Sequence, residues 1–371
     1  MLKTMDRLDP EALKIKSAQT YLIEVPVPVL RIDSSSDIEA WQVLAVCLRS
    51  QSEHEGWGYQ TGFGPVMSII RRFLEQDILP QLLGRTALTH RDWWGNLYLR
   101  RHHIGLNGPT IQGISAPEIA AWDLIARADE VPLWRLISDT APTSVSCYNT
   151  DVGWLGYSEN ELISNVNRAV ENGFKAVKIK IGSEDFTTDL KRLEKLRSAV
   201  GPDLTIAVDV NSRWDINQAM QYAPDLTDFD IAWLEEPLYP FDVDGHARLA
   251  KGISTPLLHG ESICEPLLFE EMIRAGAMEI AQPSNMKLGG ISRWLRVASF
   301  AQAEGLRIVP AGWTMMQIDQ HLAAAVRGCW MVEWIPWIRD IFVEPVSFRD
   351  GSLIVPDSPG ASTKIKPELL N

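Results

Sequence analysis

Eight short apolar runs recur between residues 144 and 334, and each gap between them has the apolar spacing of an amphipathic helix. The runs are SVSCYN (144–149), AVKIKIG (176–182), LTIAVDVN (204–211), IAWLEEP (231–237), TPLLHGE (255–261), MEIAQPS (278–284), LRIVPAG (306–312) and CWMVEW (329–334). Strands that alternate with helices form a parallel sheet, and eight such units close into a barrel of the TIM type. The pattern therefore predicts an α/β fold built on a (β/α)7β barrel.

The segments outside the barrel predict a second module of the α+β type. Residues 18–30 and 40–49 have the character of strands, whereas 67–85 and 109–138 carry apolar residues at helical spacing. A strand pair is expected within 347–360, after the barrel, and it is predicted to pack back on the first module. The predicted division is an N-terminal capping domain (1–140), the barrel (141–340) and a C-terminal segment that returns to the cap (341–371).

The charge of the chain favours a small-molecule ligand. A net charge of −13 over 371 residues disfavours binding to nucleic acid or to an anionic membrane, because both need a basic surface. The four cysteines lie far apart without a metal-type spacing, which predicts reduced thiols. The N-terminus lacks the apolar core of a signal peptide, and no window approaches a membrane span. We therefore expect a cytoplasmic protein.

Three carboxylates end three successive runs, and their spacing is regular. Lys180 to Asp209 is 29 residues, Asp209 to Glu235 is 26, and Glu235 to Glu261 is again 26, so each interval is one βα unit. Polar residues at the carboxyl ends of barrel strands are typical of active sites. Converging carboxylates repel one another unless a cation lies among them, and an oxygen-only ligand set favours Mg²⁺. The sequence therefore predicts a Mg²⁺ site.

The run AVKIKIG places Lys178 and Lys180 on one face of a strand, and Val177, Ile179 and Ile181 on the other. Taken alone, the run fits an amphipathic strand with its lysines in water. Beside a cation site, each positive charge disfavours the others, so lowered lysine pKa values are expected, and a neutral lysine is a general base. Lys180, nearer the strand end, is the predicted base. A base beside a divalent cation suits proton abstraction α to a carboxylate through a metal-stabilised enediolate.

Several motifs together resemble the enolase superfamily, specifically its mandelate racemase branch. They are KIK (178–180), DVN (209–211), LEEP (234–237), HGES (259–262), MKLGGIS (286–292) and APEIAAWDLIARADEVPLWRLI (116–137). The resemblance spans essentially the whole chain. It implies Mg²⁺ ligands at Asp209, Glu235 and Glu261, with Lys180 as base and Lys178 as its electrostatic partner. Relatives are commonly dimers or octamers, so a homo-oligomer is expected.

The resemblance also implies where the substrate binds. Asn211 and Glu333 match positions that hold the substrate's carboxylate in this branch. The loops predicted at 31–37 and 54–62 fall where the family's two substrate-covering loops lie. The other predicted substrate contacts are Arg31, His54, Trp57, Tyr59, Tyr148, Ser284 and Trp313.

The pattern departs from the racemases at their second base. Racemases of the branch carry a His on the seventh strand paired with an Asp on the sixth, and we align Trp313 and Ser284 with those positions. Proton transfer between the two faces of a substrate is then disfavoured, whereas one-base chemistry at Lys180 is retained. The alternatives for a replacement acid are His102, His103, His259 and Tyr148.

The predicted function is that of a Mg²⁺-dependent lyase that abstracts the α-proton of a hydroxy-carboxylate. Its expected reaction is the dehydration of an acid sugar, an aldonate or an aldarate, to a 2-keto-3-deoxy acid. One alternative is an isomerase, either a racemase or epimerase or a sugar-lactone cycloisomerase. A second alternative, a metal-dependent binding protein without turnover, is disfavoured because binding alone does not need the two lysines Lys178 and Lys180.

Overall fold

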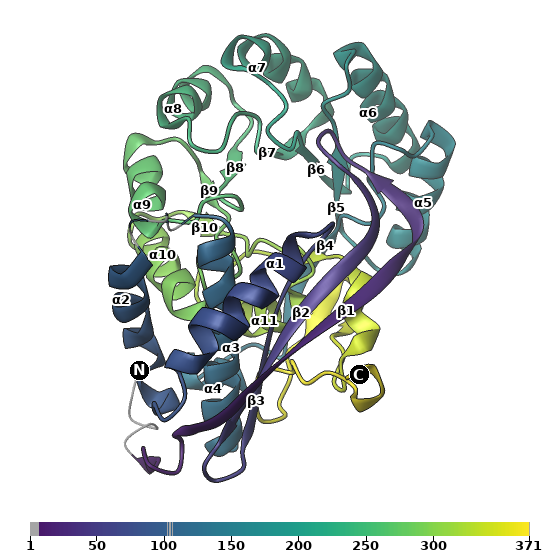
Figure 1. Cartoon of the computed structure of the whole chain (residues 1–371). Helices are drawn as coiled ribbons and strands as arrows, with labels where there is room; N and C mark the ends of the chain where they lie inside the picture. The colour runs from purple at the N-terminus through teal and green to yellow at the C-terminus, as the bar shows by residue number, and fades with distance from the viewer. Residues whose placement is uncertain (1–6, 102, 104, 106, 371) are drawn as a thin grey trace.

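A computed structural model of the chain describes residues 7–370 except 102, 104 and 106, and it shows a sheet-and-helix cap lying against a barrel (Figure 1). The cap sheet is antiparallel, in the order β1-β2-β3. The predicted helix over 67–85 is interrupted by a π-helical turn, Leu74–Ile78, and a 3-10 turn, Leu79–Gln81, that contains Pro80. The cap elements are β1 (Ile15–Ile32), β2 (Asp37–Ser50), β3 (Glu55–Gly62), α1 (Val66–Phe73), α2 (His90–Arg101), α3 (Pro109–Ala128) and α4 (Leu133–Ile137).

The barrel strands coincide with the eight predicted runs. They are β4 (Ser144–Asn149), β5 (Ala176–Lys180), β6 (Thr205–Asp209), β7 (Ile231–Glu235), β8 (Leu257–His259), β9 (Ile280–Ala281), β10 (Arg307–Ile308) and β11 (Val332–Trp334). They pair in parallel from β4 to β10 in chain order. The bridge between Ile308 and Cys329 and the pairing of β11 with β4 then close the ring.

Helices fill the gaps between the strands and surround the barrel (Figure 1). They are α5 (Glu159–Glu171), α6 (Phe186–Val200), α7 (Ile216–Tyr222), α8 (Val243–Gly252), α9 (Pro266–Ala275), α10 (Ile291–Ala303) and α11 (Met316–Ala325). Local sequence fixes several starts: Ser158 with Glu161 and Asp215 with Gln218 form capping boxes. These caps satisfy backbone N–H groups that lack a partner within the helix.

Each barrel strand has an outer face that packs under the helices and an inner face that fills the barrel. The outer face contributes side chains such as Val177, Ile179 and Val208 to the layer under the helices. The inner face carries Tyr148, Ala176, Ala207, Trp233, Leu258, Ile280 and Val309, which fill the barrel below its mouth. Since side chains alternate along a strand, Lys178 and Lys180 share the inner face with Ala176. The lysines therefore lie in the barrel and not in water.

The C-terminal strand pair lies against the barrel, which corrects the expectation that it packs on the cap. β12 (Ser347–Arg349) and β13 (Ser352–Ile354) form the expected hairpin, but β13 pairs antiparallel with β4. The tail that follows does reach the cap. Ala361 N donates to Asp123 Oδ1 on α3 (2.5 Å), and Thr363 Oγ1 donates to Trp57 O on β3 (2.5 Å).

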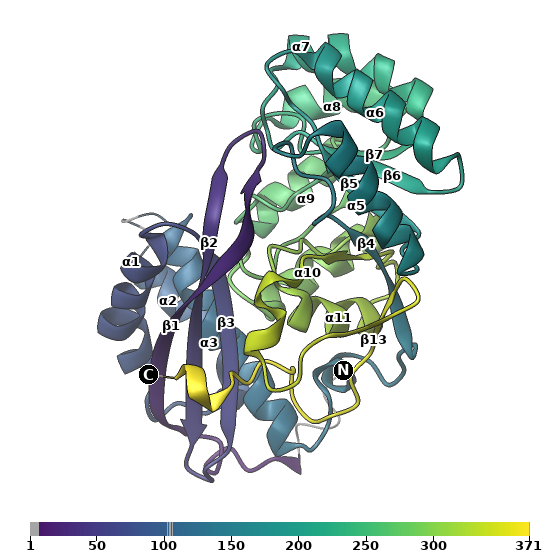
Figure 2. The same ribbon diagram turned by 90° about the vertical axis from the view of Figure 1, so that its right-hand side faces the viewer.

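The β1–β2 hairpin extends from the cap to the mouth of the barrel (Figure 2). Near its tip, Ser34 Oγ donates to Val210 O (2.6 Å), just beyond the end of β6. Leu155 N donates to Ile32 O (2.9 Å) on the β4 side. The 31–37 loop is thus tied to the ends of several barrel strands and covers them, as expected.

The second predicted covering loop, 54–62, is instead strand β3. A Cβ at Gly56 would lie 2.1 Å from Ala120 O, and one at Gly58 would lie 2.0 Å from Ala116 O. These glycines let α3 pack directly on the strand backbone. The glycines of 54–62 therefore serve helix-on-sheet packing and not a covering loop.

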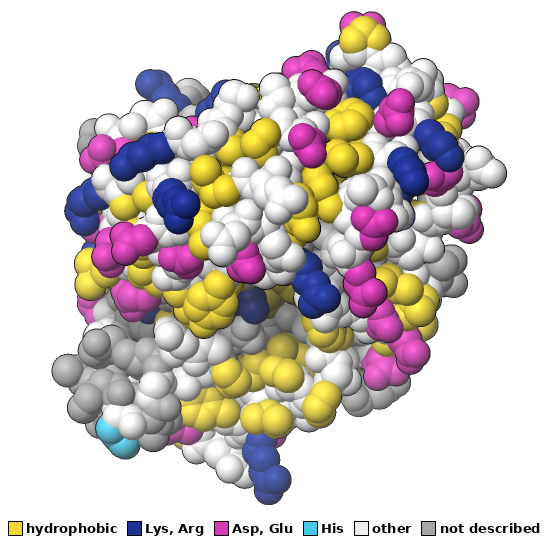
Figure 3. All heavy atoms as spheres, turned by 90° about the horizontal axis from the view of Figure 1, so that it is seen from above, with side chains coloured by type: hydrophobic (Ala, Val, Ile, Leu, Met, Phe, Trp, Pro, Cys, Tyr) yellow, Lys and Arg dark blue, Asp and Glu magenta, His cyan; other side chains and the backbone are white. Residues whose placement is uncertain are grey.

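No described helix is both long enough and apolar enough to cross a membrane. Figure 3 shows acidic and basic side chains mixed over the face seen from above Figure 1, with no continuous basic patch among the described residues of that face.

Two buried histidines predict a loss of stability in acid. His90 and His321 are 0 % exposed, and burial lowers the pKa of each imidazole to about 3. In the unfolded chain a histidine has a pKa of about 6.5, so below that pH the unfolded state binds protons that the folded state does not. Stability contributed by the neutral rings is then lost as the pH falls from about 6.5 toward 3.

Each histidine should lower the free energy of unfolding by about 1.4 kcal/mol per pH unit in that window. Urea unfolding of the wild type and of His321→Leu at pH 5 to 7 measures this slope. The variant should lose one histidine's share of the slope, and an unchanged slope would show that His321 is not buried as a neutral ring.

Candidate active site

A small pocket lies where the cap hairpin meets the carboxyl ends of the barrel strands, with about 380 Å³ of empty space. Carboxyl ends of strands are where barrel active sites are built. The pocket is lined by Asp33, Ile38 and Trp41 of the cap and by Thr150, Trp154, Lys178, Lys180, Asn211, Glu261, Trp313, Glu333 and Ile335 of the barrel.

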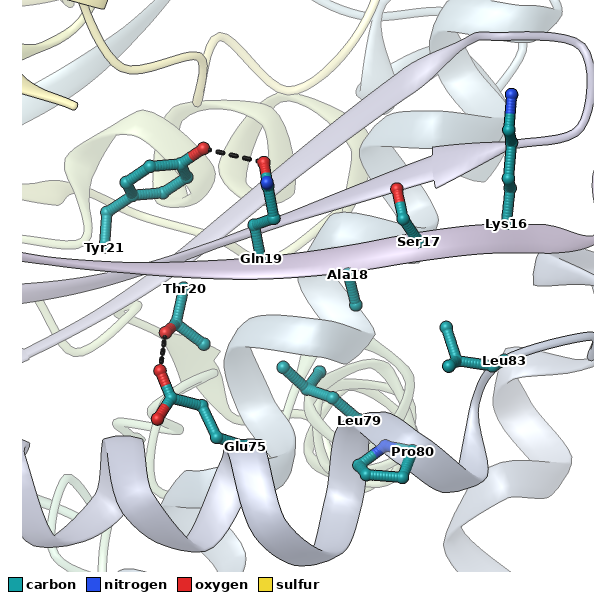
Figure 4. Close-up of a pocket in the computed structure, with 10 residues that line it drawn as sticks. All are labelled: Lys16, Ser17, Ala18, Gln19, Thr20, Tyr21, Glu75, Leu79, Pro80 and Leu83. Atoms are coloured by element: carbon teal, nitrogen blue, oxygen red, sulfur yellow. Dashed lines mark hydrogen bonds between the residues drawn. The ribbon is translucent and has the colours of Figure 1, made fainter. Parts of the chain in front are cut away.

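A larger, more open hollow of about 910 Å³ lies on the cap surface between β1 and the turns after α1 (Figure 4). Its polar contacts are of ordinary surface type: Tyr21 donates to Gln19, and Thr20 donates to Glu75. It contains no cluster of buried titratable groups, whereas the smaller pocket does. Chemistry, not size, therefore identifies the smaller pocket as the candidate active site.

The two lysines of β5 bind the strand-end carboxylates. Lys178 Nζ lies 2.6 Å from Glu235 Oε1, 2.8 Å from Glu333 Oε1 and 3.3 Å from Asp209 Oδ2. Lys180 Nζ lies 2.6 Å from Asp209 Oδ2. The parallel registers Lys180↔Asp209 and Asp209↔Glu235 produce this convergence, because they place the side chains at one level of the barrel.

The carboxylates of the cluster carry more negative charge than the lysines neutralise. Asp209, Glu235, Glu236, Glu261 and Glu333 are all buried, and among the described residues the ammonium groups that contact this cluster are those of Lys178 and Lys180. Burial, reinforced by neighbouring carboxylates, raises the pKa of Glu235 and of Glu236 to about 7 and that of Glu261 well above its ordinary value. For Asp209, burial is outweighed by Lys180 and Lys178, so its pKa falls to about 2.

The same carboxylates raise the pKa values of the two lysines, whereas the predicted lowering applies to lysines beside a bound cation. Burial lowers the pKa of Lys178, but Glu235 and Glu333 outweigh it and raise the value well above the ordinary one. Burial also lowers the pKa of Lys180, but the negative charge of Asp209 raises it, and the net pKa of Lys180 is raised. A divalent cation among the carboxylates would add a positive charge that acts in the opposite direction on both lysine pKa values.

The donor set fits a hard divalent cation. Asp209, Glu235 and Glu261 offer only oxygen donors, and buried oxygens of Glu236 and Asn211 have no hydrogen-bond partner. Among the described residues, no three carboxylate, imidazole or thiolate groups already surround one point as ligands. Lys178 and Lys180 donate to Glu235 Oε1 and Asp209 Oδ2, two carboxylates of this set. A divalent cation would offset most of the excess negative charge.

Two residues that the sequence did not reveal hold Glu235 in place. Trp233 Nε1 donates to Glu235 Oε2 (3.0 Å), and Gln282 Nε2 donates to Oε1 (2.9 Å). Trp233 precedes Glu235 by two positions and lies on the same face of β7. The alternation of side chains along a strand could have predicted this contact from the sequence. Gln282 follows β9, and nothing in the sequence places it beside β7.

Asn211 and Glu333 both line the pocket. Asn211 has a φ of 49°, and its backbone N–H donates to Asp209 Oδ1 (2.9 Å). Thr150 Oγ1, another residue missed in the sequence, donates to Glu333 Oε1 (2.6 Å). A Cβ at Gly312 would lie 2.1 Å from Glu333 Oε2, so only glycine leaves room for this carboxylate.

Trp313 forms part of the pocket wall, as predicted. Its ring meets Trp41 edge to face, with centroids 6.0 Å apart, and its buried Nε1 has no hydrogen-bond partner. We expect Trp313→Phe to keep kcat/KM within about threefold, since Phe retains a flat apolar surface. Steady-state kinetics would contradict the wall role if the loss matched that of a Lys180 variant.

Two predicted contacts lie behind the pocket wall. Arg31 Nη2 pairs with Asp151 Oδ1 (3.0 Å), and its guanidinium lies 5.3 Å from the centre of the Trp337 ring. Tyr59 is fully buried, and its hydroxyl donates to Thr314 O (3.1 Å). Both residues position pocket segments and do not line the pocket.

The structure places four other predicted contacts outside the pocket. Ser284 is buried, and its Oγ accepts from Lys287 N (3.3 Å). Tyr148 lies inside the barrel, its ring 5.6 Å from Lys178 Nζ, and burial raises its pKa well above the ordinary value. Trp57 is buried, and its backbone N–H donates to Asp123. His54 bonds Ser52 in the turn after β2; β2 has 14 residues, so the turn lies about 45 Å along the strand from the covering loop.

The structure also corrects the alignment of Trp313 with the histidine position of the racemases. Ala311 N donates to Pro283 O (3.1 Å), so Ala311 is level with Ser284, while Trp313 lies beyond in a turn with a φ of 39°. β9 is four strands from β5 in the closed ring, on the opposite side of the mouth. Serine and alanine thus stand opposite the lysines, and neither is a base at neutral pH.

The histidines named as replacement acids do not line the pocket where they are described. His259 points outward to α8: its Nε2 bonds Pro240 O (2.9 Å), and its ring stacks on His246. His103 is exposed, and His102 lies outside the described residues. Among the described residues that line the pocket, the lysines of β5 are therefore the candidates for a base.

Comparison with known proteins matches both modules. Residues 20–138 match the profile "Mandelate racemase / muconate lactonizing enzyme, N-terminal domain", and residues 161–369 match "Enolase C-terminal domain-like". The chain is 33% identical over 285 residues to L-talarate/galactarate dehydratase of Salmonella typhimurium, covering 77% of this chain and 71% of that one. It is 27% identical to 3,6-anhydro-alpha-L-galactonate cycloisomerase of Streptomyces coelicolor, covering 93% and 95%.

A solved structure agrees with the whole fold. The Salmonella typhimurium L-talarate/galactarate dehydratase, liganded with Mg and L-lyxarohydroxamate, superposes with a TM-score of 0.90 at 27% identity, covering 96% of this chain and 92% of that one. The resemblance seen in the motifs is therefore confirmed over both the cap and the barrel. The chain belongs to the mandelate racemase / muconate lactonizing enzyme family of the enolase superfamily.

Proposed function

We propose that this protein is a Mg²⁺-dependent lyase that dehydrates an acid sugar to a 2-keto-3-deoxy acid. The observation that carries the proposal is the position of Lys180, which lines the pocket beside carboxylates from three successive strand ends. The dehydratase relative and its Mg-liganded structure support it. Asp209, Glu235 and Glu261 would hold the Mg²⁺, which supplies positive charge for the substrate's carboxylate as negative charge develops on it.

Lys180 is the proposed base. In its neutral form Nζ takes the proton from C2 of the substrate, and the electron pair of the C–H bond moves toward the carboxylate. The C3 hydroxyl then leaves with a proton as water, and the resulting enol becomes the keto acid. Lys180 carries the proton it has just received, so it is the group at hand to give the proton to the leaving hydroxyl.

The neighbours of Lys180 would orient the substrate and exclude water. Asn211 lines the pocket with an unpartnered buried Oδ1, which can accept from a substrate hydroxyl. Lys178 and Glu333 form an ion pair at the pocket wall that would lie near the substrate's carboxylate. The β1–β2 hairpin covers the strand ends and separates the reacting atoms from bulk solvent.

A second candidate is an isomerase of the cycloisomerase type. The relative from Streptomyces coelicolor favours it, because that protein matches nearly the full length of this chain. Ring opening needs one base and so suits Lys180 as well. Racemisation is disfavoured, since Ser284 and Ala311 offer no base on the opposite side of the barrel mouth.

A screen of purified protein with Mg²⁺ against aldonic and aldaric acids and their lactones tests the proposal. Semicarbazide trapping should detect α-keto acid from at least one open-chain acid. Ring opening without keto acid would assign an isomerase, and no reaction with any acid would leave the metal-dependent binding protein.

Three further points stay predictions from the sequence. These are a cytoplasmic location, assembly into a homo-oligomer, either a dimer or an octamer, and the division of the chain at residues 140 and 340.

A further inference from the structure

The pocket wall that faces the strand ends is apolar and aromatic. Ile38 and Trp41 come from β2, Trp154 follows β4, Trp313 follows β10 and Ile335 follows β11. The rings brace one another, since Trp41 packs against both Trp313 and Trp337, and Trp337 packs against Trp154. The wall is thus a rigid surface of indole faces and branched aliphatic side chains.

The cationic side chains among the described lining residues are Lys178 and Lys180. Both lie on β5, and both are paired with carboxylates of the strand-end cluster. Both ammonium groups are already engaged by these carboxylates, and Lys180 Nζ also lies 5.4 Å from the centre of the Trp154 ring, so neither cation comes from the cap side of the pocket. The apolar wall has no lysine or arginine of its own within the described lining.

Two other cations near the aromatic wall, Arg31 and Lys287, are not among the lining residues. Arg31 pairs with Asp151 and packs over the Tyr157 and Trp337 rings. Lys287 Nζ lies 5.4 Å from the centre of the Trp313 ring and is not a lining residue. Neither group belongs to the described lining of the pocket, so neither is placed there to pair with an anion.

The charge that the cap does contribute is negative. Asp33 lines the pocket from the β1–β2 hairpin. Its Oδ1 accepts from the backbone N–H groups of Ser35 and Ser36, each at 2.7 Å, which fixes the carboxylate in the turn. An anion at the far end of a substrate would therefore meet indole rings and a second carboxylate.

We propose that this site is built for acid sugars with a single carboxylate, the aldonates, and that it rejects the corresponding diacids, the aldarates. A buried carboxylate without a cation or a set of donors is strongly disfavoured, and Asp33 adds like-charge repulsion. A terminal hydroxymethyl group is neutral, and the C–H faces of a sugar chain pack well on tryptophan. This inference rests on the proposed function, because it assumes that one carboxylate of the substrate lies at the strand ends.

Matched acids that differ only in the last carbon provide the test. Purified protein with Mg²⁺ is assayed with D-galactonate against galactarate, D-gluconate against D-glucarate, and D-arabinonate against D-arabinarate, and keto acid is measured. For any configuration that is accepted, kcat/KM for the aldonate should exceed that of the aldarate by at least about 100-fold, since the unpaired buried group is the difference. Equal or faster turnover of the aldarate would overturn the inference.

Two variants, Asp33→Asn and Asp37→Asn, distinguish the effect of the carboxylate in the pocket from the effect of negative charge elsewhere on the hairpin. The asparagine at 33 keeps an oxygen for the Ser35 and Ser36 N–H groups but removes the negative charge. It should raise the aldarate-to-aldonate ratio of kcat/KM by about tenfold. Asp37 lies on the same hairpin, is exposed and does not line the pocket, so its variant should leave the ratio unchanged. Equal ratios in the two variants would contradict a role for Asp33.

A binding measurement distinguishes this inference from the proposed function. If no acid is turned over, the dehydratase proposal fails, and thermal unfolding with Mg²⁺ is then measured in the presence of each pair of acids. Stabilisation by the aldonate alone would retain the single-carboxylate preference without the reaction. Equal stabilisation by both acids, or by neither, would overturn it.

Discussion

Lys180→Met should lower kcat by about 10⁴-fold while leaving Mg²⁺ binding in place. The methionine fills a similar volume, but it cannot take a proton from C2. It also removes the hydrogen bond to Asp209 Oδ2 (2.6 Å), so that carboxylate becomes free to face a cation. Steady-state kinetics on an accepted acid and Mg²⁺ titration by calorimetry measure the two effects separately.

Lys191→Met is the matched control, because Lys191 is exposed on α6 and remote from the pocket lining. It carries the same substitution and should retain full activity. If Lys180→Met keeps more than a tenth of the wild-type kcat, the base lies elsewhere. If it loses Mg²⁺ binding together with activity, Lys180 maintains the structure of the site and its loss says nothing about proton transfer.

Glu235→Gln should weaken Mg²⁺ binding by at least about 100-fold and lower activity in proportion at limiting Mg²⁺. Three side chains, Lys178, Gln282 and Trp233, donate to this carboxylate, so its orientation is fixed. The amide removes the negative charge that a hard cation needs, and it places an N–H₂ donor against other donors.

Glu271→Gln provides the control for this variant, since Glu271 is exposed on α9 and its loss should change neither quantity. Activity is measured across a Mg²⁺ series from micromolar to millimolar. Half-saturation of Glu235→Gln at the wild-type Mg²⁺ concentration would exclude Glu235 from the ligand set.

The barrel and its charged cluster could be predicted because their signals are local and periodic. Each strand is visible in the sequence as a short apolar run. The alternation of side chains along a strand assigns Lys178 and Lys180 to one face. The rule that barrel sites lie at strand ends then selects Asp209, Glu235 and Glu261 from the 48 acidic residues of the chain. The regular interval between these acids reflects one βα unit each.

The surroundings of that cluster could not be predicted, because they depend on packing between distant segments. Gln282 reaches Glu235 across 47 residues, and Thr150 reaches Glu333 across 183. Both contacts form because the barrel closes, and no local sequence pattern predicts which residues closure brings together. Trp41 enters the pocket only because the cap hairpin lies over the barrel mouth.

The wrong placements have a different cause, since each came from reading residue type without backbone context. Residues 54–62 were expected to form a covering loop, but the glycines beside Trp57 allow α3 to lie on β3. His54 was expected at the site because it begins that loop, yet β2 carries it to the far end of the cap. The alignment of the seventh strand assigned the histidine position to Trp313. The hydrogen bond from Ala311 N to Pro283 O shows instead that Ala311 is the residue level with Ser284.

The fate of the C2 hydrogen is the most direct test of the central claim, that Lys180 abstracts the α-proton. An accepted acid is converted in D₂O with Mg²⁺ and followed by proton NMR, with Lys180→Met in parallel. The wild type should consume the C2–H signal and give a keto acid that carries deuterium at C3, and the variant should leave C2–H intact. Loss of C2–H at the wild-type rate in the variant, or product that retains the C2 hydrogen, would contradict the account.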